Sequence, residues 1–84
     1  MSQTILVVDD EDQVRQILCS LLSSQGYRVL EADCGERALT VSAGEDVSLV
    51  ITDLKMPGMG GLELAGRLLD EDPDRPVIIL TGHT

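Results

Sequence analysis

The sequence is 84 residues long, so we expect a single domain with a small core and a thin stability margin. Its formal net charge is −9, with 15 acidic and only six basic side chains, which argues against direct binding to nucleic acid. No apolar run approaches the ~20 residues needed to span a bilayer, and no basic segment followed by an apolar one opens the chain. We therefore expect a cytoplasmic protein without membrane contact.

The first half of the chain predicts two strands separated by a helix. The apolar run at residues 5–8 indicates a strand buried on both faces, and it ends in the acidic pair Asp9 and Asp10. Apolar residues three and four positions apart then mark one face of a helix: Val14, Ile17, Leu18, Leu21 and Leu22. The second strand, residues 27–32, contains two charged side chains among its apolar ones, so we expect it at an edge of the sheet.

The second half of the chain continues this alternation. A second helix is predicted after a turn at residues 33–36. The third strand is the apolar run at residues 49–51, which brings Asp53 to its end just before a turn-rich loop. A third helix is predicted to begin at Gly61, and a fourth strand is predicted at residues 77–81.

Strands that alternate with helices at this spacing give an α/β fold in which a parallel sheet is covered on both faces. Right-handed crossovers and the edge character of the second strand favour the strand order 2-1-3-4, the flavodoxin-like doubly wound arrangement. The fourth strand is apolar on both faces, as central strands are, yet no later strand follows it in the sequence. We therefore expect one domain, residues 1–84, that is incomplete at its C-terminus and lacks a fifth βα unit.

Acidic side chains at the ends of neighbouring parallel strands should meet at one edge of the sheet, where ligands bind in such folds. Asp9, Asp10 and Asp53 would then repel one another and raise one another's pKa values. A hard divalent cation removes this conflict, and Mg²⁺ suits a site with few carboxylates. In the simpler alternative, Asp9 and Asp10 cap the following helix and Asp53 opens a turn. We favour a metal site because both strands end in acids.

In these residues the chain resembles the receiver domain of bacterial two-component response regulators. The resemblance runs from Thr4 to the last residue. The matching residues are the acidic pair Asp9 and Asp10, then Asp53, Lys55, Met56, Pro57, Gly61 and Thr81.

The resemblance implies a role for each of these site residues. Asp53 would accept a phosphoryl group from a sensor histidine kinase. Mg²⁺ would be bound directly by Asp10, Asp53 and the backbone carbonyl of Lys55, and by Asp9 mainly through water. Thr81 would hydrogen-bond the phosphoryl group and report its presence. Such a module takes part in phosphoryl transfer but is not a stand-alone enzyme, and the sequence does not identify its output domain or target.

The chain also departs from the family pattern. Receiver domains carry a lysine in a fifth βα unit that contacts the phosphoryl group, whereas this sequence ends at Thr84 before such a unit. Lys55 is not expected to replace that lysine, because we expect its side chain to lie in solvent. Without a fifth strand the edge of the fourth strand would be exposed, and two copies of the chain are then expected to pair there as a homodimer. In the competing interpretation the 84 residues are part of a full-length receiver, in which case the edge is only apparent and a monomer is expected.

Two enzyme classes are disfavoured. A phosphatase with a strand-end aspartate nucleophile would need a second acid two residues after Asp53, where this chain has Lys55. Binding of a nucleotide by a P-loop would need a G-x-x-x-x-G-K-[ST] segment, which the sequence lacks. The alternative that stays open is a truncated receiver that acts as a non-phosphorylated interaction or dimerisation module.

The remaining candidates carry weaker expectations. Cys19 and Cys34 lie far apart without a C-x-x-C pairing, so we expect two thiols rather than a disulfide or a zinc site. The lone His83 is expected to be exposed rather than a phosphorelay or metal residue. Met56 and Met59 could fill the loop or face a partner, and the sequence does not decide between these roles.

Overall fold

The computed structural model describes residues 3–81 as a four-stranded sheet with helices between the strands. In chain order the elements are β1 (Thr4–Val8), α1 (Asp12–Ser24), β2 (Arg28–Ala32), α2 (Gly35–Gly44), β3 (Leu49–Asp53), α3 (Gly61–Glu71) and β4 (Val77–Leu80). All neighbouring strands are parallel and their order is β2-β1-β3-β4. The predicted flavodoxin-like arrangement is therefore confirmed. None of the helices in this part of the chain is long and apolar enough to cross a membrane.

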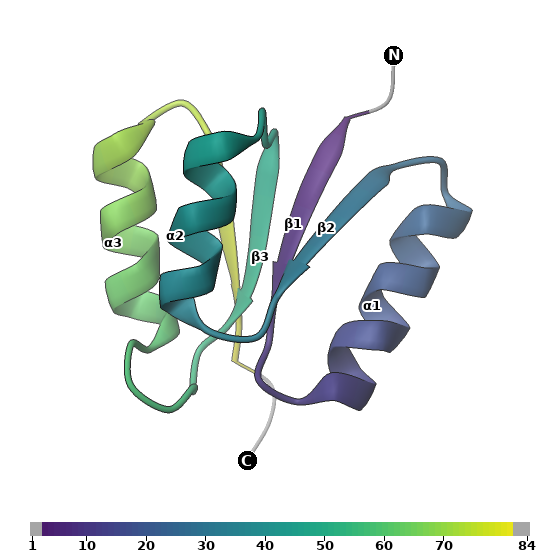
Figure 1. Ribbon diagram of the computed structural model, residues 1–84, viewed down its shortest axis with the longest axis horizontal. Helices are drawn as coiled ribbons and strands as arrows, with labels where there is room; N and C mark the ends of the chain where they lie inside the picture. The colour runs from purple at the N-terminus through teal and green to yellow at the C-terminus, as the bar shows by residue number, and fades with distance from the viewer. Residues whose placement is uncertain (1–2, 82–84) are drawn as a thin grey trace.

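Helices lie on both faces of the sheet (Figure 1). α1 packs against β1 and β2 on one face, whereas α2 and α3 lie side by side on the other. All five residues of β1 are buried, as expected for a strand between two neighbours. In β2, by contrast, Arg28 and Glu31 are exposed, which agrees with its predicted place at the edge.

The main hydrophobic core lies between the sheet and the helices α2 and α3. Leu6, Val8 and Val50 of the central strands and Leu64 and Leu68 of α3 are almost completely inaccessible to solvent. Burying each such side chain contributes about 1.5–3 kcal/mol relative to leaving it exposed. Because β1 and β3 lie in this core, the positions at which they end are firmly fixed.

Met56 and Met59, whose role the sequence left open, belong to this core. They are 9% and 8% exposed, so they anchor the loop between β3 and α3 instead of facing a partner. Met59 lies tightly against the start of α2, where a Cβ added to Gly35 would come within 2.8 Å of its sulfur. The buried methionines therefore fix the loop that follows Asp53.

The face of the sheet on the α1 side is less completely covered. Ile78 and Leu80 of β4 are 46% and 39% exposed, and Ile17 and Leu21 of α1 are 60% and 59% exposed. These exposed side chains belong to the predicted apolar stripe of the first helix and to the fourth strand, which the sequence predicts to be apolar on both faces.

Candidate functional site

The three candidate acids meet at the C-terminal edge of the sheet. β1 and β3 are neighbours, with Val8 opposite Thr52, so the residues that follow them leave the sheet at the same edge. Asp9 follows β1 directly, and Asp53 is the last residue of β3. One carboxylate oxygen each from Asp9, Asp10 and Asp53 lies within 4.8 Å of the other two. The spacing is compatible with a single cation between them.

A pocket of about 200 Å³ opens at this edge. The residues that line it are Asp10, Glu11, Asp53, Leu54, Lys55, Leu80 and Thr81. They come from the loops after β1 and β3 and from the end of β4, so the pocket unites candidates from three separate parts of the sequence. Lys55 and Thr81 are exposed and can be reached from solvent. His83 lies outside the residues that the structure describes.

Asp9 is the buried member of the cluster, with only 4% of its surface exposed. Its carboxylate oxygen Oδ1 accepts a hydrogen bond from the backbone N–H of Glu11 at 2.9 Å. Burial raises the pKa of Asp9, the Glu11 N–H partly opposes this rise, and the carboxylates of Asp53 and Asp10 add to it. A buried acid beside two others is an arrangement that a divalent cation would stabilise, and three carboxylates are donors that Mg²⁺ prefers.

The loop after Asp53 is folded closely against the start of α3. The backbone N–H of Gly61 donates to the carbonyl oxygen of Leu54 at 2.8 Å, and the N–H of Leu54 donates to the carbonyl oxygen of Leu80 at 3.1 Å. A Cβ on residue 61 would overlap the carbonyl oxygen of Asp53 and lie 3.0 Å from the Cα of Leu54. Glycine is therefore required at position 61 for the backbone of α3 to approach the site.

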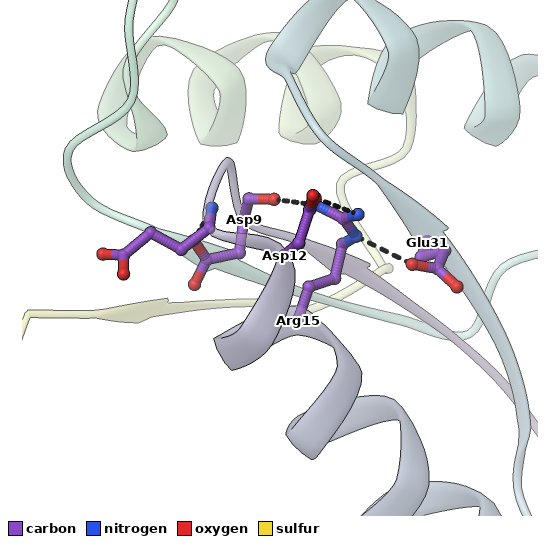
Figure 2. A network of polar contacts seen from close by, with 5 residues as sticks. Asp9, Asp12, Arg15 and Glu31 are labelled. Atoms are coloured by element: carbon purple, nitrogen blue, oxygen red, sulfur yellow. Dashed lines mark hydrogen bonds and ion pairs between the residues drawn. The ribbon is translucent and has the colours of Figure 1, made fainter.

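Arg15 is a residue near the site that the sequence analysis missed (Figure 2). Its guanidinium donates to the backbone carbonyl oxygen of Asp9 at 2.7 Å, to Asp12 at 2.6 Å and to Glu31 at 2.7 Å. The sequence did contain a signal: Glu31 interrupts an apolar strand, and Arg15 lies one turn inside the helix that follows the acidic pair. The two cysteines, Cys19 and Cys34, are both free thiols, as expected.

Comparison with known proteins identifies the family. A family model described as the response regulator receiver domain matches residues 5–84. The chain therefore belongs to the response regulator receiver domain family. Modules of this family are parts of two-component systems, which agrees with the parallel α/β fold and the acidic edge described above.

Individual relatives support the same conclusion. Transcriptional regulatory protein GlrR of Escherichia coli (strain K12) is 42% identical over 79 residues, which cover 94% of this chain and 18% of GlrR. Sporulation initiation phosphotransferase F of Bacillus subtilis (strain 168) is 36% identical over 83 residues, which cover 99% of this chain and 67% of that protein. The chain spans about a fifth of the length of the first curated relatives that it matches.

Response regulator protein TrrA of Thermotoga maritima is a similar solved structure. It is 40% identical, with a TM-score of 0.92 over 98% of this chain and 71% of the TrrA chain, and it was solved in complex with Mg(2+)-BeF. A second structure contains TrrA in complex with the histidine kinase ThkA, and here the TM-score is 0.90.

Proposed function

We propose that the chain is the phosphoacceptor receiver module of a two-component signal transduction system, and that Asp53 accepts a phosphoryl group from a sensor histidine kinase. The observation that carries this proposal is the cluster of Asp9, Asp10 and Asp53, whose ligand oxygens lie within 4.8 Å of one another. The kinase as partner is supported by TrrA, which is 40% identical and was solved with the histidine kinase ThkA.

In this proposal Mg²⁺ is the cofactor of the site. Asp10, Asp53 and the backbone carbonyl of Lys55 would hold the ion, and Asp9 would contact it mainly through water. When bound, the ion supplies positive charge that offsets the negative charges of Asp53 and of the incoming phosphoryl group. The oxygen-only donor set supports Mg²⁺ over softer metals. The related TrrA was solved in complex with Mg(2+)-BeF.

The residues that act on the phosphoryl group are Asp53 and Thr81. A carboxylate oxygen of Asp53 forms a bond to phosphorus while the bond from phosphorus to the kinase histidine nitrogen breaks, and the electron pair of that bond stays on the nitrogen. Thr81 lines the same pocket as Asp53, so its hydroxyl can donate a hydrogen bond to the phosphoryl group. The chain acts as the acceptor of the group and not as a stand-alone enzyme.

The phosphorylated module then controls an output domain or target protein in the cytoplasm. Residues 1–84 supply the receiver up to its fourth strand. With a net charge of −9, this segment is not itself expected to bind nucleic acid.

Acetyl phosphate, a small phosphodonor, tests the proposal without the kinase. Incubated with Mg²⁺, the chain should gain one phosphoryl group by intact mass, and Asp53→Asn should gain none. Loss of one electrostatic group from a site costs on the order of 10²–10³ in rate. The 84-residue chain should therefore react more slowly by about this factor than a version extended through a fifth βα unit and its lysine. No labelling of Asp53 in the extended version would refute the function.

A second candidate function is a non-phosphorylated dimerisation module. It is favoured by one observation: β4 lies at the edge of the sheet, and its residues Ile78 and Leu80 are substantially exposed. Unpaired strand edges with apolar side chains promote association, and pairing of two β4 strands about a two-fold axis would be a closed solution. Dimerisation of the chain together with no labelling of Asp53 in either length would favour this candidate.

A further inference from the structure

The structure shows a contact that joins α1 and β2 to the acidic edge. Arg15 is the fourth residue of α1, and its side chain is 12% exposed, whereas those of Asp12 and Glu31 are 74% and 52% exposed. Each nitrogen of the guanidinium has its own acceptor: Nε donates to Glu31, Nη1 to the Asp9 carbonyl and Nη2 to Asp12. Figure 2 shows these hydrogen bonds of the Arg15 guanidinium to Asp9, Asp12 and Glu31.

Of the three acceptors of Arg15, the backbone carbonyl oxygen of Asp9 lies nearest to the proposed metal ligands in the chain. It belongs to the peptide group that joins Asp9 to Asp10, and that group is planar. Fixing the carbonyl oxygen therefore also fixes the direction in which the chain enters Asp10. On the other side of Asp9, its backbone N–H donates to the carbonyl oxygen of Ala32 at 3.2 Å. The segment is thus held through backbone groups, independently of the carboxylates that form the cluster.

Glu31 orients the guanidinium of Arg15. Its carboxylate accepts from Nε of Arg15, and β2, on which it lies, pairs in register with β1, with Val7 opposite Glu31. A bidentate or forked arginine is geometrically specific, because its planar donors are fixed relative to one another. A lysine would supply the same charge but could not satisfy three acceptors in these fixed directions.

We propose that Arg15, oriented by Glu31, is a positioning residue that holds the Asp9–Asp10 segment in the conformation required for divalent cation binding. This inference rests on the proposed metal site. Groups that orient metal ligands from outside commonly affect metal affinity by 10- to 100-fold, roughly, when they are replaced. The metal affinity of the receiver would then depend on the contact between Arg15 of α1 and Glu31 of β2.

Substitutions that conserve charge separate positioning from electrostatics. Arg15→Lys should weaken Mg²⁺ and Mn²⁺ binding by about tenfold in isothermal titration calorimetry. Glu31→Asp should weaken it in the same direction but by less, because the shortened carboxylate can still partly orient Arg15. The matched controls Arg67→Lys and Glu63→Asp alter an exposed ion pair of 3.0 Å on α3 and should leave the dissociation constant unchanged. Binding is measured well below each melting temperature, so that a loss of stability alone does not alter the constant.

With the neutral variant Arg15→Gln, the positioning and charge explanations predict opposite changes in cation affinity. Removing a positive charge near three carboxylates would strengthen cation binding if charge alone mattered, whereas loss of positioning should weaken it. As a second readout, the amide NMR signals of Asp9 and Asp10 in the metal-free Arg15→Lys chain should shift or broaden, while signals from the centre of β3 stay in place.

The outcomes distinguish this inference from the proposed function. If the wild-type chain binds either metal and Arg15→Lys binds it equally well, the positioning role is wrong and the metal site stands. If the wild-type chain binds neither metal, both the metal site and the inference fail. Weaker binding by Arg15→Lys and Arg15→Gln, with Arg67→Lys unchanged, is the result that the inference requires.

Discussion

Replacing Gly61 with alanine should destabilise the fold through a clash at the backbone of Asp53. The added Cβ would overlap the carbonyl oxygen of Asp53 and stand 3.0 Å from the Cα of Leu54. Both are main-chain atoms, so no side chain can rotate away and the loop or α3 itself must shift. Forced overpacking of this kind costs about 1–3 kcal/mol.

A matched control exists in the same helix. A Cβ at Gly66 would meet no heavy atom within 4 Å. Gly66→Ala should therefore stabilise the protein by about 0.5–1 kcal/mol, because alanine loses less conformational freedom in a helix than glycine. The two Gly→Ala substitutions thus have opposite expected signs and should differ by about 1.5–4 kcal/mol in the free energy of unfolding.

Urea denaturation followed by circular dichroism measures both variants under the same conditions. We expect the midpoint to fall for Gly61→Ala and to rise for Gly66→Ala, with similar slopes. If Gly61→Ala is as stable as Gly66→Ala, the close approach of α3 to the Asp53 loop does not constrain the site, and the argument for glycine at position 61 is wrong.

Three further predictions concern the metal, the β4 edge and the partly buried thiol of Cys19. Increasing Mg²⁺ should raise the melting temperature of the wild-type chain by mass action; the absence of a shift, or an equal shift in Asp53→Ala, would count against the metal site. Light scattering on the 84-residue chain should show a dimer at micromolar concentration that Ile78→Lys and Leu80→Lys dissociate, whereas a stable wild-type monomer would contradict pairing through β4. Burial, and secondarily a nearby carboxylate, raises the pKa of the Cys19 thiol in the folded chain above its ordinary value of 9.0. The protonated Cys19 thiol therefore contributes to the free energy of unfolding at pH values below 9.0, and this contribution is lost as the pH rises through the pKa of the folded chain. In Cys34→Ser, iodoacetamide labelling should reach its midpoint at higher pH in the folded chain than in urea, and equal midpoints would contradict this reasoning.

The sheet and its order were predictable because the strongest patterns in the sequence determine them. The apolar runs of β1 and β3 lack alternation, which marks central strands, and the charged residues of β2 mark an edge. From the parallel order it follows that Asp9 and Asp53 leave the sheet at the same edge. The convergence of the acids could thus be derived from strand topology alone.

Other features depend on contacts that sequence patterns do not specify. Met56 and Met59 lie in a loop, yet both are buried in the core, and Met59 packs against the start of α2. Arg75 stands between aspartates and prolines in a polar segment, but it is only 7% exposed and pairs with Glu71 at 3.0 Å. Arg15 contacts Glu31 from another element. Met59 and Arg15 contact residues that are distant in sequence, and Arg75 lies beyond the end of α3, so no helical or strand periodicity predicts these contacts.

The central claim is that Asp53 is the phosphoacceptor, and locating the phosphoryl group tests it most directly. After reaction of the chain with acetyl phosphate and Mg²⁺, borohydride reduction converts an aspartyl phosphate to homoserine, and peptide mass spectrometry identifies the converted position. We expect homoserine at position 53 alone, at a low level in the 84-residue chain and at a high level in the extended version. Homoserine at Asp9 or Asp10, or none in the extended version, would contradict it.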